Sequence, residues 1–113
     1  MEKELQRIDE TIELIQHEPA VLLYFYNDHC APCLSLRPKV IDLIRAKYKN
    51  IKLRFINSEK HPEFSSEFGV YENPVLILFF DGKESYRGSK YISVAELENK
   101  IKRPYDIIFN DDV

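Results

Sequence analysis

Residues 20–33, AVLLYFYNDHCAPC, decide the fold of this chain. The first seven, Ala20–Tyr26, are apolar or aromatic throughout, which is typical of a strand buried on both faces of a sheet. Residues 34–48 have the three- and four-residue apolar spacing of a helix. The sequence therefore predicts that Cys30 and Cys33 lie at a strand-to-helix turn, with Cys30 at the helix N-terminus.

This position predicts a reactive thiol at Cys30. The first turn of a helix leaves backbone N–H groups unpaired and carries a partial positive charge. Both effects stabilise a thiolate and lower the pKa of its thiol. Cys33 lies about one turn further on, within reach to close a small disulfide ring, so the pair indicates redox chemistry. Pro32 suits the start of a helix, and we expect it also to restrain the disulfide.

Two other interpretations of the cysteine pair are weaker. A zinc site needs four nitrogen or sulfur ligands, and His17, His29 and His61 have no second paired spacing. A structural disulfide across two residues would remove little chain entropy. We therefore expect no metal and no organic cofactor, because the redox group is the Cys30–Cys33 disulfide itself.

The composition excludes several classes of partner. The chain has 113 residues, 44% of them hydrophobic and 31% charged, with a net charge of −3. This fits one domain with a core and gives no reason to expect binding to nucleic acid or to a membrane. The first residues contain no apolar signal segment, so we expect a cytoplasmic protein, and we expect a monomer.

The remaining periodicities predict a βαβ unit followed by a β-hairpin with its turn at Asp81-Gly82. This order indicates an α/β three-layer sandwich with a mixed four-stranded sheet flanked by helices. We expect residues 1–104 to form the domain, since the last helix should stop before Pro104. For the tail, 105–113, disorder and an added edge strand are both open. The expected strands are 20–26, 51–56, 75–80 and 83–87, and the expected helices are 2–17, 34–48, 63–68 and 93–103.

Residues 1–104 resemble the thioredoxin family. The CAPC motif after the first long strand carries the resemblance, with Asn73-Pro74 before the third strand, Gly88 after the fourth, and Pro38 inside the motif's helix. The family often begins with a strand. Here the first predicted helix starts almost at Met1, so we expect that strand to be absent.

The resemblance implies a thiol–disulfide oxidoreductase that reduces protein disulfides. Cys30 would be the nucleophile and Cys33 the resolving thiol, with electrons supplied by a thioredoxin-reductase-type donor. The resemblance also implies a cis peptide bond before Pro74, which would pack beside the cysteines. Asn73, Pro74 and Gly88 would bind an extended substrate segment.

The chain departs from the family at several site positions. Thioredoxins typically read Trp-Cys-Gly-Pro-Cys, whereas His29 and Ala31 replace the Trp and Gly here. The family's buried Asp and its Lys align with Tyr24 and Leu53, so the proton-handling pair beneath the disulfide is missing. These losses keep open a second function, a non-catalytic binding or chaperone-like adaptor module.

Two neighbours of the motif have open roles. His29 is either an exposed turn residue or a titrating group that tunes the thiolate. Tyr26 is expected to pack near the site. Whether its hydroxyl forms a hydrogen bond near the cysteines is open.

Overall fold

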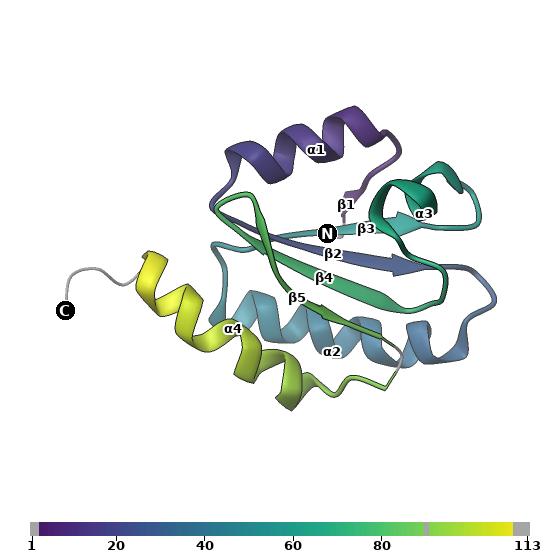
Figure 1. The fold of residues 1–113 in the computed structure, drawn as a ribbon. Coiled ribbons are helices and arrows are strands. Elements are labelled where there is room, and N and C mark those ends of the chain that lie inside the picture. The colour runs from purple at the N-terminus through teal and green to yellow at the C-terminus, as the bar shows by residue number, and fades with distance from the viewer. Residues whose placement is uncertain (1–2, 90, 110–113) are drawn as a thin grey trace.

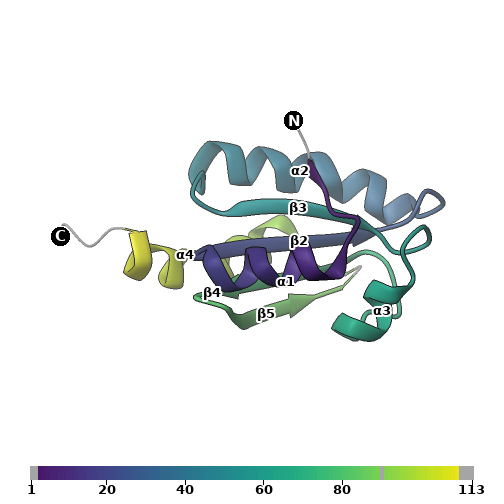
Figure 2. The same ribbon diagram turned by 90° about the horizontal axis from the view of Figure 1, so that it is seen from above.

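The computed structural model describes residues 3–89 and 91–109. In this part of the chain, five strands form one mixed sheet in the order β1-β3-β2-β4-β5. Helices α1 and α3 cover one face of the sheet, and α2 and α4 cover the other (Figures 1 and 2). The predicted three-layer α/β sandwich is confirmed. The elements are β1 (Lys3–Glu4), α1 (Ile8–His17), β2 (Ala20–Tyr26), α2 (Ala31–Lys47), β3 (Lys52–Asn57), α3 (Glu63–Phe68), β4 (Val75–Phe80), β5 (Lys83–Gly88) and α4 (Val94–Phe109).

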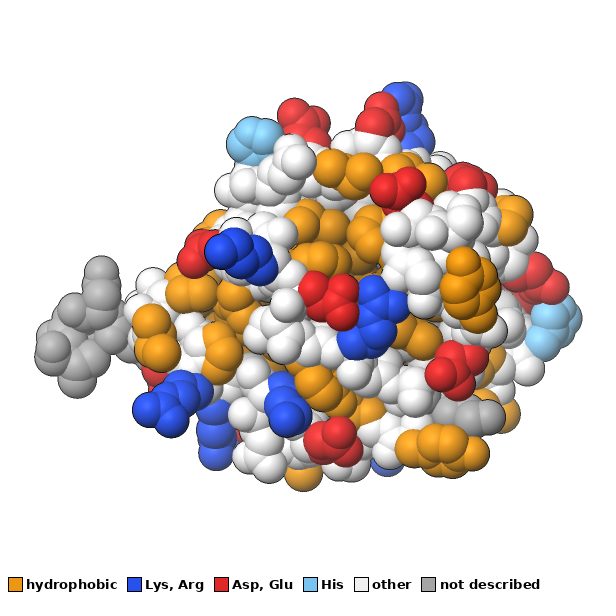
Figure 3. Space-filling model, viewed as in Figure 1, with side chains coloured by type: hydrophobic (Ala, Val, Ile, Leu, Met, Phe, Trp, Pro, Cys, Tyr) orange, Lys and Arg blue, Asp and Glu red, His pale blue; other side chains and the backbone are white. Residues whose placement is uncertain are grey.

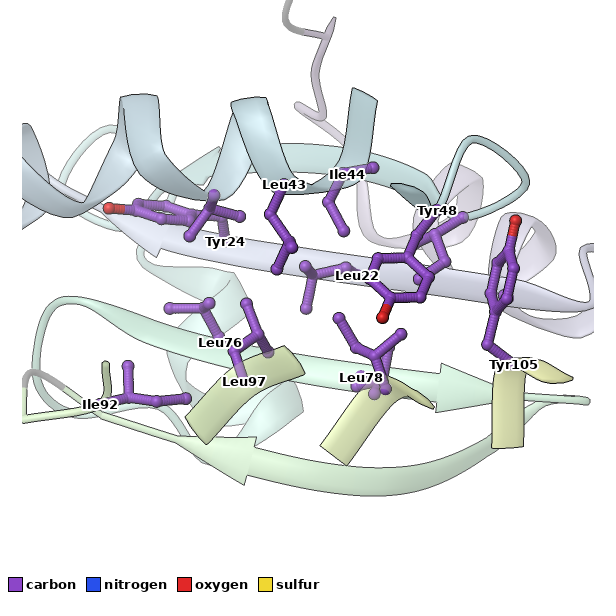
Figure 4. Close-up of a cluster of buried hydrophobic side chains, with 14 of the residues drawn as sticks. Leu22, Tyr24, Leu43, Ile44, Tyr48, Leu76, Leu78, Ile92, Leu97 and Tyr105 are labelled. Carbon is purple, nitrogen blue, oxygen red and sulfur yellow. The ribbon is translucent and has the colours of Figure 1, made fainter. Parts of the chain in front are cut away.

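The apolar run of β2 is explained by two hydrophobic cores. Successive side chains of a strand point to opposite faces of the sheet. Leu22 and Tyr24 therefore enter the core beneath α2 and α4 (Figure 4), while Leu23 and Phe25 enter the core beneath α1 and α3. All four side chains are fully buried, so β2 has no face on which a polar residue would reach water.

The strand register brings the functional segments to one end of the sheet, where β2 ends and β4 begins. β2 runs parallel to β3 and antiparallel to β4, with Phe25 opposite Val75. The loop that leaves β2 and the segment that enters β4 therefore meet at the same end of the sheet. The hairpin between β4 and β5 turns at Asp81 and Gly82, whose φ angles of 52° and 79° confirm the predicted tight turn.

The expectation that the first strand is absent was wrong. Lys3 and Glu4 form β1, which pairs parallel with β3, and α1 begins only at Ile8. The backbone N–H of Leu5 donates to the carbonyl of Phe55 at 2.8 Å, and the Leu5 side chain is buried. Pairing with the open edge of β3 therefore outweighs the helical spacing that Leu5 shares with the residues of α1.

The expected end of the last helix was also wrong. α4 continues through Pro104 to Phe109, so residues 105–109 are helical rather than disordered or extended. An interior proline disfavours a helix by about 3 kcal/mol, and burial opposes this effect. Tyr105 is 7% exposed, packs edge-on against Tyr48 with ring centroids 5.0 Å apart, and accepts a hydrogen bond from the Asn50 N–H. Residues 110–113 lie outside the described residues.

On the face drawn in Figure 3, acidic, basic and apolar side chains are interspersed. Among residues 3–89 and 91–109, no helix is both long and apolar enough to cross a membrane.

Candidate active site

Cys30 and Cys33 lie where β2 passes into α2, as the sequence predicts. Cys30 is the N-cap of α2, and its Sγ accepts a hydrogen bond from the Cys33 backbone N–H at 3.2 Å. A first-turn N–H group thus points at the sulfur atom. The two residues form a disulfide with their Cα atoms 5.2 Å apart, within the usual range of roughly 4.4–6.8 Å.

The two sulfur-bearing residues differ in exposure. Cys33 is only 2% exposed, whereas Cys30 is partly exposed. Ala31 and Pro32, which separate them, are exposed and form the first turn of α2. A substrate that approaches from solvent therefore reaches Cys30 before Cys33.

Tyr24 fixes the first turn of α2 to the sheet. Its hydroxyl donates to the Cys33 carbonyl oxygen at 2.7 Å inside the core. Burial raises the pKa of Tyr24 to about 12, so the side chain is neutral near pH 7. Tyr24 is a hydrogen-bond donor here, and it cannot serve as the acid that the family places at this position.

Replacing Tyr24 with phenylalanine should lower the free energy of unfolding by about 1 kcal/mol, because a buried carbonyl loses its side-chain donor. Urea denaturation of the oxidised protein measures this change. Tyr71→Phe is the matched control, because Tyr71 is 80% exposed and should be replaceable without effect. Equal losses in the two variants would contradict the structural role of Tyr24.

A polar network that the sequence did not reveal borders Cys33. The Tyr26 hydroxyl donates to Glu4 Oε1 at 2.8 Å, and the Arg37 guanidinium donates to Glu4 Oε2 at 3.2 Å. Arg37 also lies 4.8 Å above the Tyr26 ring and 3.9 Å above the Phe55 ring. The spacing of Cys33 and Arg37 could have indicated a shared helix face. Nothing near Glu4 in the sequence could have placed it there, because its position depends on β1.

A pocket of about 230 Å³ connects this network to the resolving cysteine. It brings together side chains from β1, β2, the following loop and α2. A larger hollow of about 510 Å³ lies beside β1 and α1, but neither cysteine lines it. The smaller pocket is therefore the one that bears on thiol chemistry. It is lined by Glu4, Tyr26, Asn27, Asp28, Cys33, Leu34 and Arg37.

The segment before β4 lies at the same end of the sheet as the loop that carries the cysteines. The Asn73–Pro74 peptide bond is cis, and Pro74 is buried. Asn73 Oδ1 accepts a hydrogen bond from the Ser58 hydroxyl at 3.2 Å. Gly88, at the end of β5, lines a hollow of about 260 Å³ together with Val75, the first residue of β4.

His29 belongs to the exposed turn. Its side chain is 80% exposed, and Nε2 lies 3.7 Å from a carboxylate oxygen of Glu59. Its backbone N–H donates to Asn27 Oδ1 at 2.8 Å. In the part of the chain that the structure describes, no group of three or more His, Cys, Asp or Glu side chains is arranged to hold a metal ion.

A Cys-x-x-Cys disulfide at the start of a helix, directly after a central strand, defines the class of thiol–disulfide oxidoreductases. The family model described as thioredoxin matches residues 5–103, and the chain belongs to the thioredoxin family. The sequence-based assignment of fold class and function is thereby confirmed, and the adaptor alternative is not favoured.

Individual relatives agree with this assignment. Thioredoxin-like protein YdfQ of Bacillus subtilis is 34% identical over 83 residues, which cover 74% of this chain and 73% of YdfQ. A thioredoxin of Alicyclobacillus acidocaldarius is 31% identical over 89 residues, or 79% of this chain and 85% of the relative. The oxidised mitochondrial thioredoxin 3 of Saccharomyces cerevisiae, at 25% identity, superposes with a TM-score of 0.80 over 89% of this chain and 93% of its own.

Proposed function

We propose that the protein reduces protein disulfides with Cys30 as the attacking nucleophile and Cys33 as the resolving thiol. The observation that carries this proposal is the contrast between the two sulfur atoms. Cys30 is partly exposed and its Sγ accepts a helix N-terminal N–H, whereas Cys33 is buried behind it. A thiolate is therefore favoured at the accessible position.

The reaction proceeds in two exchanges. The Cys30 thiolate attacks one sulfur of the substrate disulfide, and the other substrate sulfur leaves as a thiolate. The Cys33 thiolate then attacks Cys30 Sγ, breaks the mixed disulfide and releases the second substrate thiolate. Two electrons pass to the substrate, and the Cys30–Cys33 disulfide remains.

A reductant must then restore the dithiol. A flavoenzyme of the thioredoxin reductase type is the proposed donor, because thioredoxin-family proteins are reduced in this way. Disulfide exchange itself needs no metal or organic cofactor, since the redox group belongs to the chain. We place this cycle in the cytoplasm, where thiols are kept reduced, and we take the active species to be a monomer.

We assign substrate docking to the end of the sheet that lies beside the cysteine loop. Asn73 would offer its backbone to an extended substrate segment, with Pro74 and Gly88 bordering the same surface. The shared register of β2 and β4 supports this placement. Support also comes from the hollow that Gly88 lines with the exposed Tyr71. Ala31, Pro32 and His29 would frame the approach to Cys30.

Reduction of insulin disulfides with dithiothreitol as electron donor tests the function. We expect catalysed precipitation of the insulin B chain at substoichiometric protein. An adaptor whose cysteines are idle would give only the rate of dithiothreitol alone.

Gly88→Ala should disturb the docking surface. A Cβ atom at this position would lie 2.6 Å from Ile92 Cδ1 and 2.6 Å from the Tyr86 hydroxyl, so both side chains must shift. We expect a loss of about 1–3 kcal/mol in the free energy of unfolding, as for an overpacked site, and a raised KM for insulin. Ser85→Ala, on the exposed part of β5, is the control. An unchanged KM in Gly88→Ala would argue against docking at this end of the sheet.

A further inference from the structure

The resolving step requires that the Cys33 thiol lose its proton. Only a thiolate attacks a disulfide, and an ordinary cysteine thiol has a pKa of about 8.5, which burial raises further. Cys33 is 2% exposed, so its side chain has little contact with bulk solvent. Its proton must therefore pass to a group that borders it.

Few groups can take that proton. Tyr24 is neutral, and its hydroxyl proton is committed to the Cys33 carbonyl. Besides Cys33, five polar or charged residues line the 230 Å³ pocket: Glu4 from β1, Tyr26 from β2, Asn27 and Asp28 from the loop, and Arg37 from α2. Of these, the two carboxylates are the possible acceptors near neutral pH.

The hydrogen bonds favour Glu4 over Asp28. One oxygen of Glu4 accepts from Tyr26 and the other from Arg37, and both donors line the pocket with Cys33. The Asp28 carboxylate instead accepts a longer bond, 3.4 Å, from the Asn57 side-chain amide. Glu4 is thus joined to the Cys33 pocket through a hydroxyl, which can accept one proton while it donates another.

The pocket has room to complete the connection. A water molecule occupies roughly 30 Å³ of liquid and needs two to four polar partners. The pocket holds about 230 Å³, and Glu4, Tyr26, Cys33 and Arg37 are among the residues that line it. The pocket therefore has room for water beside Cys33 and Tyr26.

We propose that Glu4 accepts the proton of Cys33 through pocket water and the Tyr26 hydroxyl during the resolving step. This inference rests on the proposed roles of the two cysteines. Water takes the Cys33 proton while it gives one to Tyr26 Oη, and Tyr26 passes its own proton to Glu4 Oε1. The new thiolate attacks Cys30 Sγ, the substrate sulfur leaves with the bonding electron pair, and the proton on Glu4 is afterwards returned through solvent to that thiolate.

Arg37 provides the positive charge that offsets the negative charge of this pocket before and after the proton transfer. Before transfer its guanidinium is paired with the Glu4 carboxylate at 3.2 Å. After transfer Glu4 is neutral, and Arg37 becomes the counter-charge of the Cys33 thiolate in the same pocket. The total charge of the pocket does not change. β1, the strand that the sequence did not predict, thus supplies the proton acceptor.

Stopped-flow reaction of the reduced protein with an aromatic disulfide that releases a coloured thiolate separates the two steps. The first coloured thiolate reports attack by Cys30, and the second reports resolution by Cys33. Glu4→Gln and Tyr26→Phe should each slow the second phase about 10²-fold near pH 7 and leave the first phase unchanged. Their deficit should shrink as the pH rises through about 8.5 and above, where the thiol ionises unaided.

The controls decide between a relay and a structural effect. Asp28→Asn tests the rival carboxylate, and Glu67→Gln, exposed on α3, tests the loss of an arbitrary charge. Neither should slow the second phase. A deficit in Glu4→Gln that is the same at every pH, or a deficit in Asp28→Asn alone, would overturn the relay. Absence of the first phase from the wild-type protein would refute the roles of both cysteines, and the relay with them.

Discussion

Replacing Cys30 with serine should abolish catalysed disulfide reduction, leaving only the rate of the electron donor alone. Serine offers no thiolate, and Cys33, at 2% exposure, cannot reach a substrate disulfide in its place. Cys33→Ser should also lose turnover, but at a different step. Its Cys30 still attacks, and the reaction then stops at the mixed disulfide because the resolving thiol is missing. The insulin reduction assay measures the loss of catalysis in Cys30→Ser.

Trapping separates the two variants. Under non-reducing conditions, Cys33→Ser should carry substrate proteins as covalent adducts that dithiothreitol releases, whereas Cys30→Ser should carry none. A Cys30→Ser, Cys33→Ser double variant is the matched control for non-covalent capture. Equal capture by the two single variants would contradict the division of roles.

Phe55→Ala should destabilise the fold by about 3–5 kcal/mol, which is a large part of the roughly 5–15 kcal/mol that stabilises a domain. Phe55 is fully buried in β3, packs against the Tyr24 ring at 5.2 Å and lies beneath the Arg37 guanidinium. Truncation therefore leaves a cavity directly under the site.

Urea denaturation followed by circular dichroism measures this loss. Ile107→Ala is the control, because Ile107 is 71% exposed on α4 and its truncation should change the free energy of unfolding by less than about 0.5 kcal/mol. A Phe55→Ala protein as stable as this control would contradict the described packing.

The elements predicted correctly are those whose signals are local. The apolar run Ala20–Tyr26 was predicted to be a strand covered on both faces, and the structure divides it between two cores. Asp81-Gly82 specified its own turn. The last helix was expected to begin at Ser93, whose hydroxyl accepts the Glu96 N–H at 3.1 Å. In each case the residues that determine the conformation are close neighbours in sequence.

The elements predicted wrongly depend on contacts between distant residues. Leu5 has helical spacing with α1, but it is held in place by Phe55, fifty residues away. Pro104 would end an isolated helix, but Tyr105 is anchored by Tyr48 and Asn50. The Glu4–Arg37 ion pair arises only once β1 is formed, which is why the polar wall of the Cys33 pocket could not be inferred from the sequence.

The central claim is that Cys30 is the activated nucleophile, and alkylation of the reduced protein tests it most directly. Iodoacetamide labelling over a range of pH, with the labelled cysteine identified by mass spectrometry, gives the rate and the pKa of each thiol. We predict that Cys30 is labelled faster than Cys33. The pH dependence of its labelling rate should give a pKa below the ordinary value of about 8.5, because the thiolate is favoured at the helix N-terminus. Faster labelling of Cys33, or a Cys30 pKa at or above the ordinary value, would contradict the account.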